Sequence, residues 1–108
     1  MSFVPTSGMR ASARRGIELV NNGRAGDGLE SATITRARKI AAGKPLTPDH
    51  AKRMHSFFSR HAVDRKAGWS ESGKETPGYT AHMLWGGDSG ASWAHKVVKK
   101  IASGNSRK

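Results

Sequence analysis

The sequence contains no cysteine, so neither a disulfide bond nor a thiolate metal site can form. It has no apolar run long enough to cross a bilayer, and residues 1–9 lack the continuous apolar stretch of a signal peptide. Acidic residues are also scarce, with eight among 108. We therefore expect a soluble intracellular protein, with no membrane among its partners.

Basic residues are abundant: 19 lysines and arginines give a formal net charge of +11. Residues 31–66 hold nine of these cations and only two acidic residues, so this third of the chain carries +7 of the total. Such a concentration attracts polyphosphates, and nucleic acid above all. The alternative interpretation is a solvated surface whose charges keep the protein soluble.

Apolar residues recur at the helical period, and no segment alternates as a strand would. The pattern predicts an all-α fold, a small single domain of four to five short helices. The helices are expected at residues 9–20, 31–42, 47–64, 79–85 and 90–103. Around them the sequence predicts a flexible N-terminus (1–8), a single helical domain (9–103) and a basic C-terminal tail (104–108).

Several helix ends have local sequence signals. Thr47 is expected to cap the third helix, and Gly43 to follow the end of the second. Asp88 or Ser89 is predicted to cap the last helix. Gly16 is unfavourable within the first helix, by about 1 kcal/mol relative to alanine.

The second and third predicted helices form a central basic αα-hairpin that is similar in spacing to a helix-turn-helix. The third helix has an apolar side and a cationic side. If the pair binds nucleic acid, its basic side chains contact mainly phosphate. The predicted binding residues are Arg36, Lys39, Lys44, Lys52, Arg53 and Arg60.

The predicted structural core combines the apolar side of the third helix with the three tryptophans. Its members are Met54, Phe57, Phe58, Trp69, Trp85 and Trp93. We expect the tryptophans to form a second apolar cluster that docks the last helix, with Trp69 tying the polar loop of residues 67–78 to the domain. Stacking of the tryptophans on unpaired bases is the alternative.

No catalytic signature is present, and no cofactor or metal is predicted. The five histidines lack metal-ligand spacing, and the serines lack the context of a nucleophile. We therefore do not expect an enzyme. The remaining enzymatic alternative is a metal-dependent nuclease that uses His82 and His95.

Several motifs resemble a small uncharacterised domain of tailed bacteriophages, found alone or joined to head-assembly and maturation proteins. They include the run of the Arg-rich second helix that starts at Arg36, Met-His-Ser-Phe-Phe-Ser-Arg-His at residues 54–61, and Leu-Trp-Gly-Gly-Asp at residues 84–88. The likeness covers roughly residues 11–94. This chain departs from the pattern at Ala62, where an acidic residue is usual, and in the insert at residues 70–78.

The resemblance implies a phage protein located in the host cytoplasm, the virion or both, and it supplies no catalytic residues. Together with the charge, it favours nucleic-acid binding, most simply to DNA. The alternative is a virion structural or assembly protein whose basic surface docks on acidic capsid components.

Overall fold

The computed structural model describes residues 3–25, 31–61 and 68–106, with side chains as far as residue 103. Within these residues the fold is all-α, which confirms the predicted class. The helices are α1 (Ser7–Asn21), α2 (Ser31–Ala41), α3 (Pro48–Arg60), α4 (Pro77–Leu84) and α5 (Gly87–Ser106). The predicted third helix continued to residue 64, and its part from residue 62 onward lies outside the described residues.

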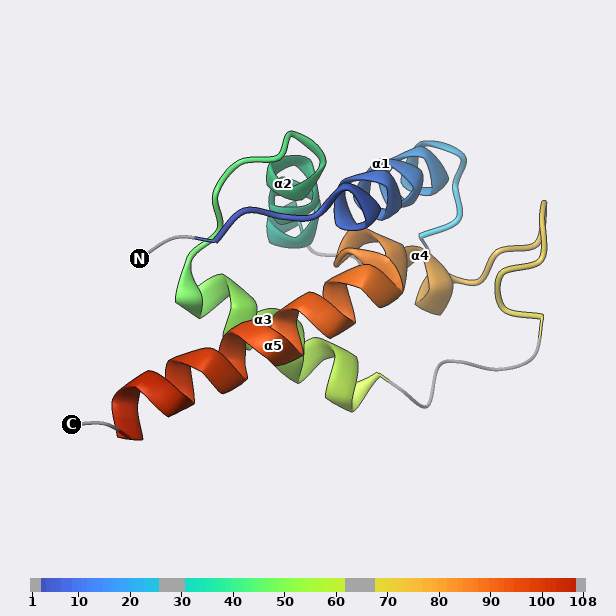
Figure 1. Cartoon of the computed structure of the whole chain (residues 1–108). Coiled ribbons are helices and arrows are strands. Elements are labelled where there is room, and N and C mark those ends of the chain that lie inside the picture. Colours follow the sequence, from blue (N-terminus) through green and yellow to red (C-terminus); the bar gives the residue numbers. More distant parts are fainter. Residues whose placement is uncertain (1–2, 26–30, 62–67, 107–108) are drawn as a thin grey trace.

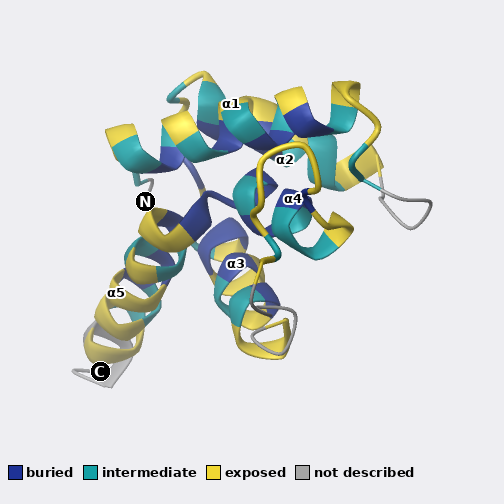
Figure 2. Ribbon diagram, turned by 90° about the vertical axis from the view of Figure 1, so that its right-hand side faces the viewer, coloured by how far each residue is buried: buried dark blue, intermediate teal, exposed yellow. Residues whose placement is uncertain are grey.

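The helices are arranged as two pairs with the short α4 beside them (Figure 1). α1 packs against α2 and α4, α3 packs along α5, and α1 also contacts α5. Buried residues from both pairs form one core. The outward faces of the helices are largely exposed (Figure 2). The core cluster consists of Met9, Ala13, Ile40, Leu46, Met54, Phe57, Trp85 and Ala94.

Threonine side chains cap the N-termini of α1, α3 and α4, at Thr6, Thr47 and Thr76. The Thr6 hydroxyl accepts a hydrogen bond from the Met9 amide at 3.2 Å, and Thr47 accepts one from the His50 amide at 3.1 Å. Each bond satisfies an amide that has no partner within its own helix. The predicted cap at Thr47 is confirmed, and so is the turn at Gly43, which adopts a φ of +73°.

Phe3 and Val4, which lie within the predicted flexible N-terminus, are hydrogen-bonded to later parts of the chain. The Phe3 amide donates to the Leu46 carbonyl at 2.9 Å, and the Leu46 amide donates back at 2.6 Å. The Trp93 indole N–H donates to the Val4 carbonyl at 3.2 Å, and its ring meets Phe3 edge-on. These bonds join the start of the chain to the turn before α3, which contains Leu46, and to α5, which contains Trp93.

The predicted bounds of the last helix are wrong at both ends. Gly86 and Gly87 have φ values of +109° and +64°, so the chain turns from α4 straight into α5. Asp88 and Ser89 therefore lie in the first turn of α5 and do not cap it. At the other end the helix continues through Gly104, since one glycine costs a helix only about 1 kcal/mol.

The three tryptophans do not form the expected second cluster. Trp85 belongs to the main core and Trp93 packs against it. Trp69 instead contacts Tyr79 and His82 of α4, with ring centroids 5.3 and 5.1 Å away. Trp69 thus attaches its loop to α4, as expected. The three tryptophans have separate surroundings because Trp69 lies in the loop, Trp85 at the end of α4 and Trp93 within α5.

Candidate nucleic-acid interface

A groove of about 600 Å³ separates α2 from α3. The two helices are consecutive, but α2 packs mainly on α1 and α3 on α5, so the predicted hairpin is an open one. α4 and the residue after it close the groove at its base. The groove is lined by Thr33, Arg36, Lys52, Arg53, Ser56, Phe57, Arg60, His61, Ala81 and Trp85.

The groove brings together four of the six predicted binding residues. α2 contributes Arg36, and α3 contributes Lys52, Arg53 and Arg60. Residues four apart on a helix share a face, which places Lys52 and Arg60 two turns apart along the same side of α3. The opposite side of α3 is anchored by buried Met54, so the cationic side faces outward.

The other two predicted residues lie outside the groove. Lys39 lines an adjacent hollow, which shares Arg36 and Arg53 with the groove. Lys44 is exposed in the turn after α2 and lines neither hollow. The cationic surface therefore extends along α2 as far as Lys39.

Most of the groove's positive charge is not neutralised. Arg53 forms an exposed ion pair with Asp49 at 2.9 Å, one helical turn away. The hydrogen bond and positive charge of Arg53 hold the pKa of Asp49 below its usual value. Arg36, Lys52 and Arg60 form no ion pair within the part of the chain that the structure describes. Three of the four groove cations thus have no acidic partner among the described residues, and the pair of the fourth, Arg53, is exposed to solvent.

No protein-family model matches the chain, and searches of curated proteins and solved structures find no similar protein. The groove is therefore interpreted from its own chemistry.

Planar groups are stacked beneath the cations. The Phe57 and Trp85 rings stack at a centroid distance of 5.0 Å and an interplanar angle of 16°. His61 stacks on Phe57 at 4.5 Å, and the Arg36 guanidinium carbon lies 5.7 Å from the Trp85 ring centroid. We call the series His61, Phe57, Trp85 and Arg36 the planar ladder. Its two inner members are buried, and its ends are more exposed.

His50 lies behind this ladder, where its ring meets the edge of Trp85. Its Nε2 atom is buried without a hydrogen-bond partner. Burial, reinforced by the positive charges of Arg36 and Lys39, lowers the pKa of His50 from 6.5 to about 4. The imidazole is therefore neutral at physiological pH, and it adds no charge to the groove.

The ladder shows what the sequence interpretation missed. The sequence places Phe57 in the core, offers base stacking by Trp85 only as an alternative to the core, and does not single out His61 as a binding residue. The spacing of Phe57 and His61, four apart at the C-terminal end of α3, signals that their rings meet. No local signal brings Arg36 to Trp85, because 49 positions separate them in the sequence.

The histidines of the nuclease alternative have different partners. His82 Nε2 lies 3.1 Å from Asp88 Oδ1, whereas His95 stacks against His55 of α3. Among the described residues, no three histidine or acidic side chains are placed to share a metal ion. The helices in this part of the chain include none that is long and apolar enough to cross a membrane.

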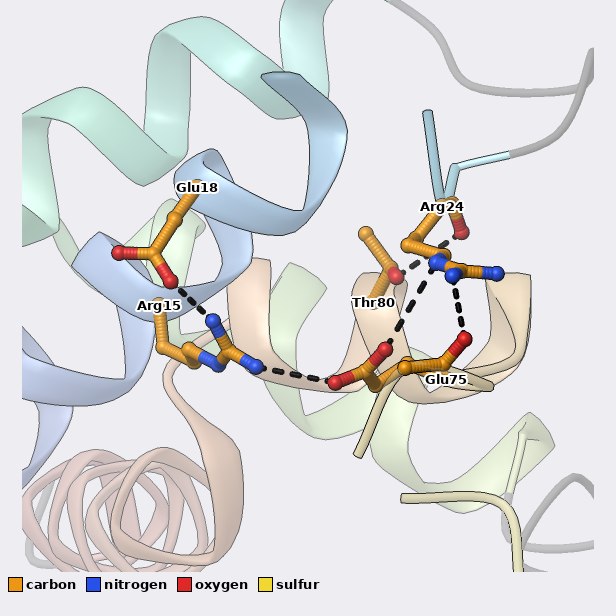
Figure 3. Close-up of polar contacts among 6 residues, drawn as sticks. Arg15, Glu18, Arg24, Glu75 and Thr80 are labelled. Atoms are coloured by element: carbon orange, nitrogen blue, oxygen red, sulfur yellow. Dashed lines mark hydrogen bonds and ion pairs between the residues drawn. The ribbon is translucent and has the colours of Figure 1, made fainter. Parts of the chain in front are cut away.

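The acidic residue Glu75 lies outside the groove. It pairs with Arg15 of α1 at 2.9 Å and lies 3.7 Å from Arg24, whose guanidinium also donates to the Gly73 carbonyl (Figure 3). Backbone amides of Glu75 and Gly73, followed by the two arginines, lower the pKa of Glu75. Two of the chain's cations are thus used to hold a loop.

Proposed function

We propose that this protein binds nucleic acid through the groove between α2 and α3, mainly by contacts to phosphate. One observation supports this above all: Arg36, Lys52, Arg53 and Arg60 converge from two helices on one groove. Like charges gathered in this way repel one another, and an anionic polymer relieves the repulsion. In the phage setting that the motifs imply, the ligand is the phage genome, met in the host cytoplasm or the virion.

The affinity is expected to depend steeply on salt. Each phosphate contact releases condensed counterions, so the logarithm of the affinity falls with the logarithm of salt concentration by about 0.9 per contact on a duplex. If the four groove cations and Lys39 all touch phosphate, the slope is roughly −4 to −5 on duplex, and somewhat shallower on a single strand. A ligand bound through apolar contacts shows no such slope.

The test is fluorescence anisotropy with labelled oligonucleotides of about 15 nucleotides, single-stranded and duplex, titrated at several salt concentrations. The groove variant replaces Lys52 and Arg60 by glutamine. Both side chains are exposed and unpaired among the described residues, so the fold should tolerate the change. We expect weaker binding and a slope reduced by about 2.

The matched control replaces Lys99 and Lys100 of α5 by glutamine, which removes the same charge from an exposed surface outside the groove. Its binding should stay close to that of the parent protein. Absence of a complex with either oligonucleotide at low salt would refute the proposal. Equal losses in the two variants would also refute it, because they would indicate a diffuse charge effect. Polyglutamate serves as competitor: if it displaces the oligonucleotide at equal charge concentration, an acidic protein is the better partner.

A further inference from the structure

The groove is hollow, and it combines cations with planar surfaces. A helix that reads duplex DNA must project into a major groove, which is about 12 Å wide. Here the cations of α3 line a cavity that they share with α2, and the planar ladder lies at its base. This is the arrangement expected of a groove that binds a nucleic-acid strand within it, and not of a helix that projects into DNA.

A double helix cannot use the planar groups. Its base faces are stacked on one another and only base edges reach its grooves. A single strand has base faces exposed, and proteins bind them by stacking on aromatic rings and arginine guanidinium groups beside a basic track for the backbone. At about 600 Å³ the groove lies within the range of clefts that enclose small organic groups, about 300–1,000 Å³.

We infer that the groove binds single-stranded nucleic acid, with bases packed against the planar ladder and phosphates held by Lys52, Arg53 and Arg60. This inference rests on the proposed function and narrows its ligand class. Arg36 and His61 are the members of the ladder that a base contacts first, because Phe57 and Trp85 are only 8% and 9% exposed. The buried pair holds the two outer groups in place.

The decisive experiment separates bases from phosphates. A labelled oligothymidylate is compared with an abasic strand of equal length and charge, with a duplex, and with oligouridylate. We expect the abasic strand and the duplex to bind at least about 5-fold more weakly than oligothymidylate, since stacking of one base is typically worth that much. The comparison of oligothymidylate with oligouridylate shows which of the two strands the groove prefers, and either order supports the inference.

Equal binding of the abasic strand and oligothymidylate would overturn the inference and leave phosphate binding intact. Tighter binding of the duplex would overturn it in the same way. Failure of all the strands to bind would instead refute the proposed function itself.

A pair of histidine variants tests whether the planar ladder is the part of the groove that binds bases. His61→Ala removes the exposed end of the ladder, whereas His95→Ala removes an exposed histidine of α5 outside the groove. We expect His61→Ala to lose the preference for oligothymidylate over the abasic strand, while its affinity for the abasic strand stays within about 2-fold. His95→Ala should keep the preference. A preference that survives in His61→Ala would overturn the role of the ladder, and circular dichroism checks that both variants are folded.

Discussion

His50 lies where the hydrophobic core meets the basic groove, and its surroundings oppose protonation. Its ring packs on Trp85, its Nε2 has no partner, and the charges of Arg36 and Lys39 are close enough to act on it. A proton on this imidazole would place a buried positive charge beside other positive charges. The chain therefore keeps a neutral histidine next to its most cationic surface.

The stability of the fold should consequently fall in mild acid. The pKa of His50 is about 4 in the folded chain and 6.5 in the unfolded one, so the unfolded state binds the proton first. The contribution is fully present above pH 6.5 and is lost as the pH falls toward 4. The free energy of unfolding, measured with urea, should drop by on the order of 1–3 kcal/mol across this window, after allowance for solvent screening.

His50→Gln tests whether this one residue is responsible. The variant has no titrating group at this position, so its stability should vary much less with pH between about 6.5 and 4. His95→Gln, at an exposed position, is the control and should keep the profile of the parent protein. A profile that His50→Gln leaves unchanged would assign the acid sensitivity to other groups.

The helices α1 and α4 approach each other closely, and a glycine permits this contact. A Cβ atom built on Gly16 would lie 2.6 Å from the Leu84 amide nitrogen and 3.0 Å from its Cα. These are backbone atoms, which cannot turn away as a side chain can. The residue that appears unfavourable within its own helix is thus required by the packing of another.

Gly16→Ala should therefore destabilise the protein despite its better helix propensity. Overpacking of this kind typically costs about 1–3 kcal/mol, and the propensity gain offsets only about 1 kcal/mol. We expect a net loss of up to about 2 kcal/mol in urea unfolding. Ala11→Gly, at an exposed site of the same helix, isolates the propensity and should also destabilise, by about 1 kcal/mol. A Gly16→Ala variant more stable than the parent protein would show that the helices can separate.

The loop of residues 68–76 is held at two points, Trp69 against α4 and Glu75 against α1. Glu75→Gln removes the charge that pairs with Arg15 and Arg24, so the loop should become more accessible to limited proteolysis and the melting temperature should fall. Glu71→Gln removes an equal charge from an exposed position of the same loop and should leave both measurements near the parent values. Equal effects of the two changes would point to net charge instead of the ion pairs.

These elements show which features could be predicted from the sequence. The cap at Thr47 and the turn at Gly43 depend on neighbouring residues, and both were predictable. The cationic side of α3 was predictable for the same reason, since helical spacing alone aligns Lys52 with Arg60. The bond of Phe3 to Leu46 was not predictable, because it joins segments far apart along the chain.

The candidate site, too, was predictable only in part. Its charges could be read from the sequence. The shape of the groove could not, because it depends on α2 packing against α1 while α3 packs against α5. The ladder had no complete local signature either, since its members come from three separate segments: α2, the end of α3 and the end of α4. Arg36 reaches Trp85 only once α2 has docked on α1.

At the scale of the whole molecule, the charge is unevenly compensated. Glu18 and Glu75 pair with the arginines at residues 15 and 24, on the part of the fold that Figure 3 shows. Beside the groove, Asp49 pairs with Arg53, while Arg36, Lys52 and Arg60 form no ion pair in the described parts of the chain. The acidic residues thus secure the loop, and the cations of the groove remain close together and mutually repelling.

This arrangement predicts that binding and stability oppose each other. Two unit charges about 10 Å apart in water repel by on the order of 0.4 kcal/mol, and salt at about 0.1 M screens most of this. The double change of Lys52 and Arg60 to glutamine should therefore raise the free energy of unfolding at low salt by on the order of 0.5–1 kcal/mol while it weakens oligonucleotide binding. The gain in stability should shrink as salt is added.

The double change of Lys99 and Lys100 should stabilise the protein less, because α5 holds them outside the groove. If the groove variant were the less stable one at low salt, the cations would have to contribute packing to the fold, and the groove would not be a surface kept charged for a ligand.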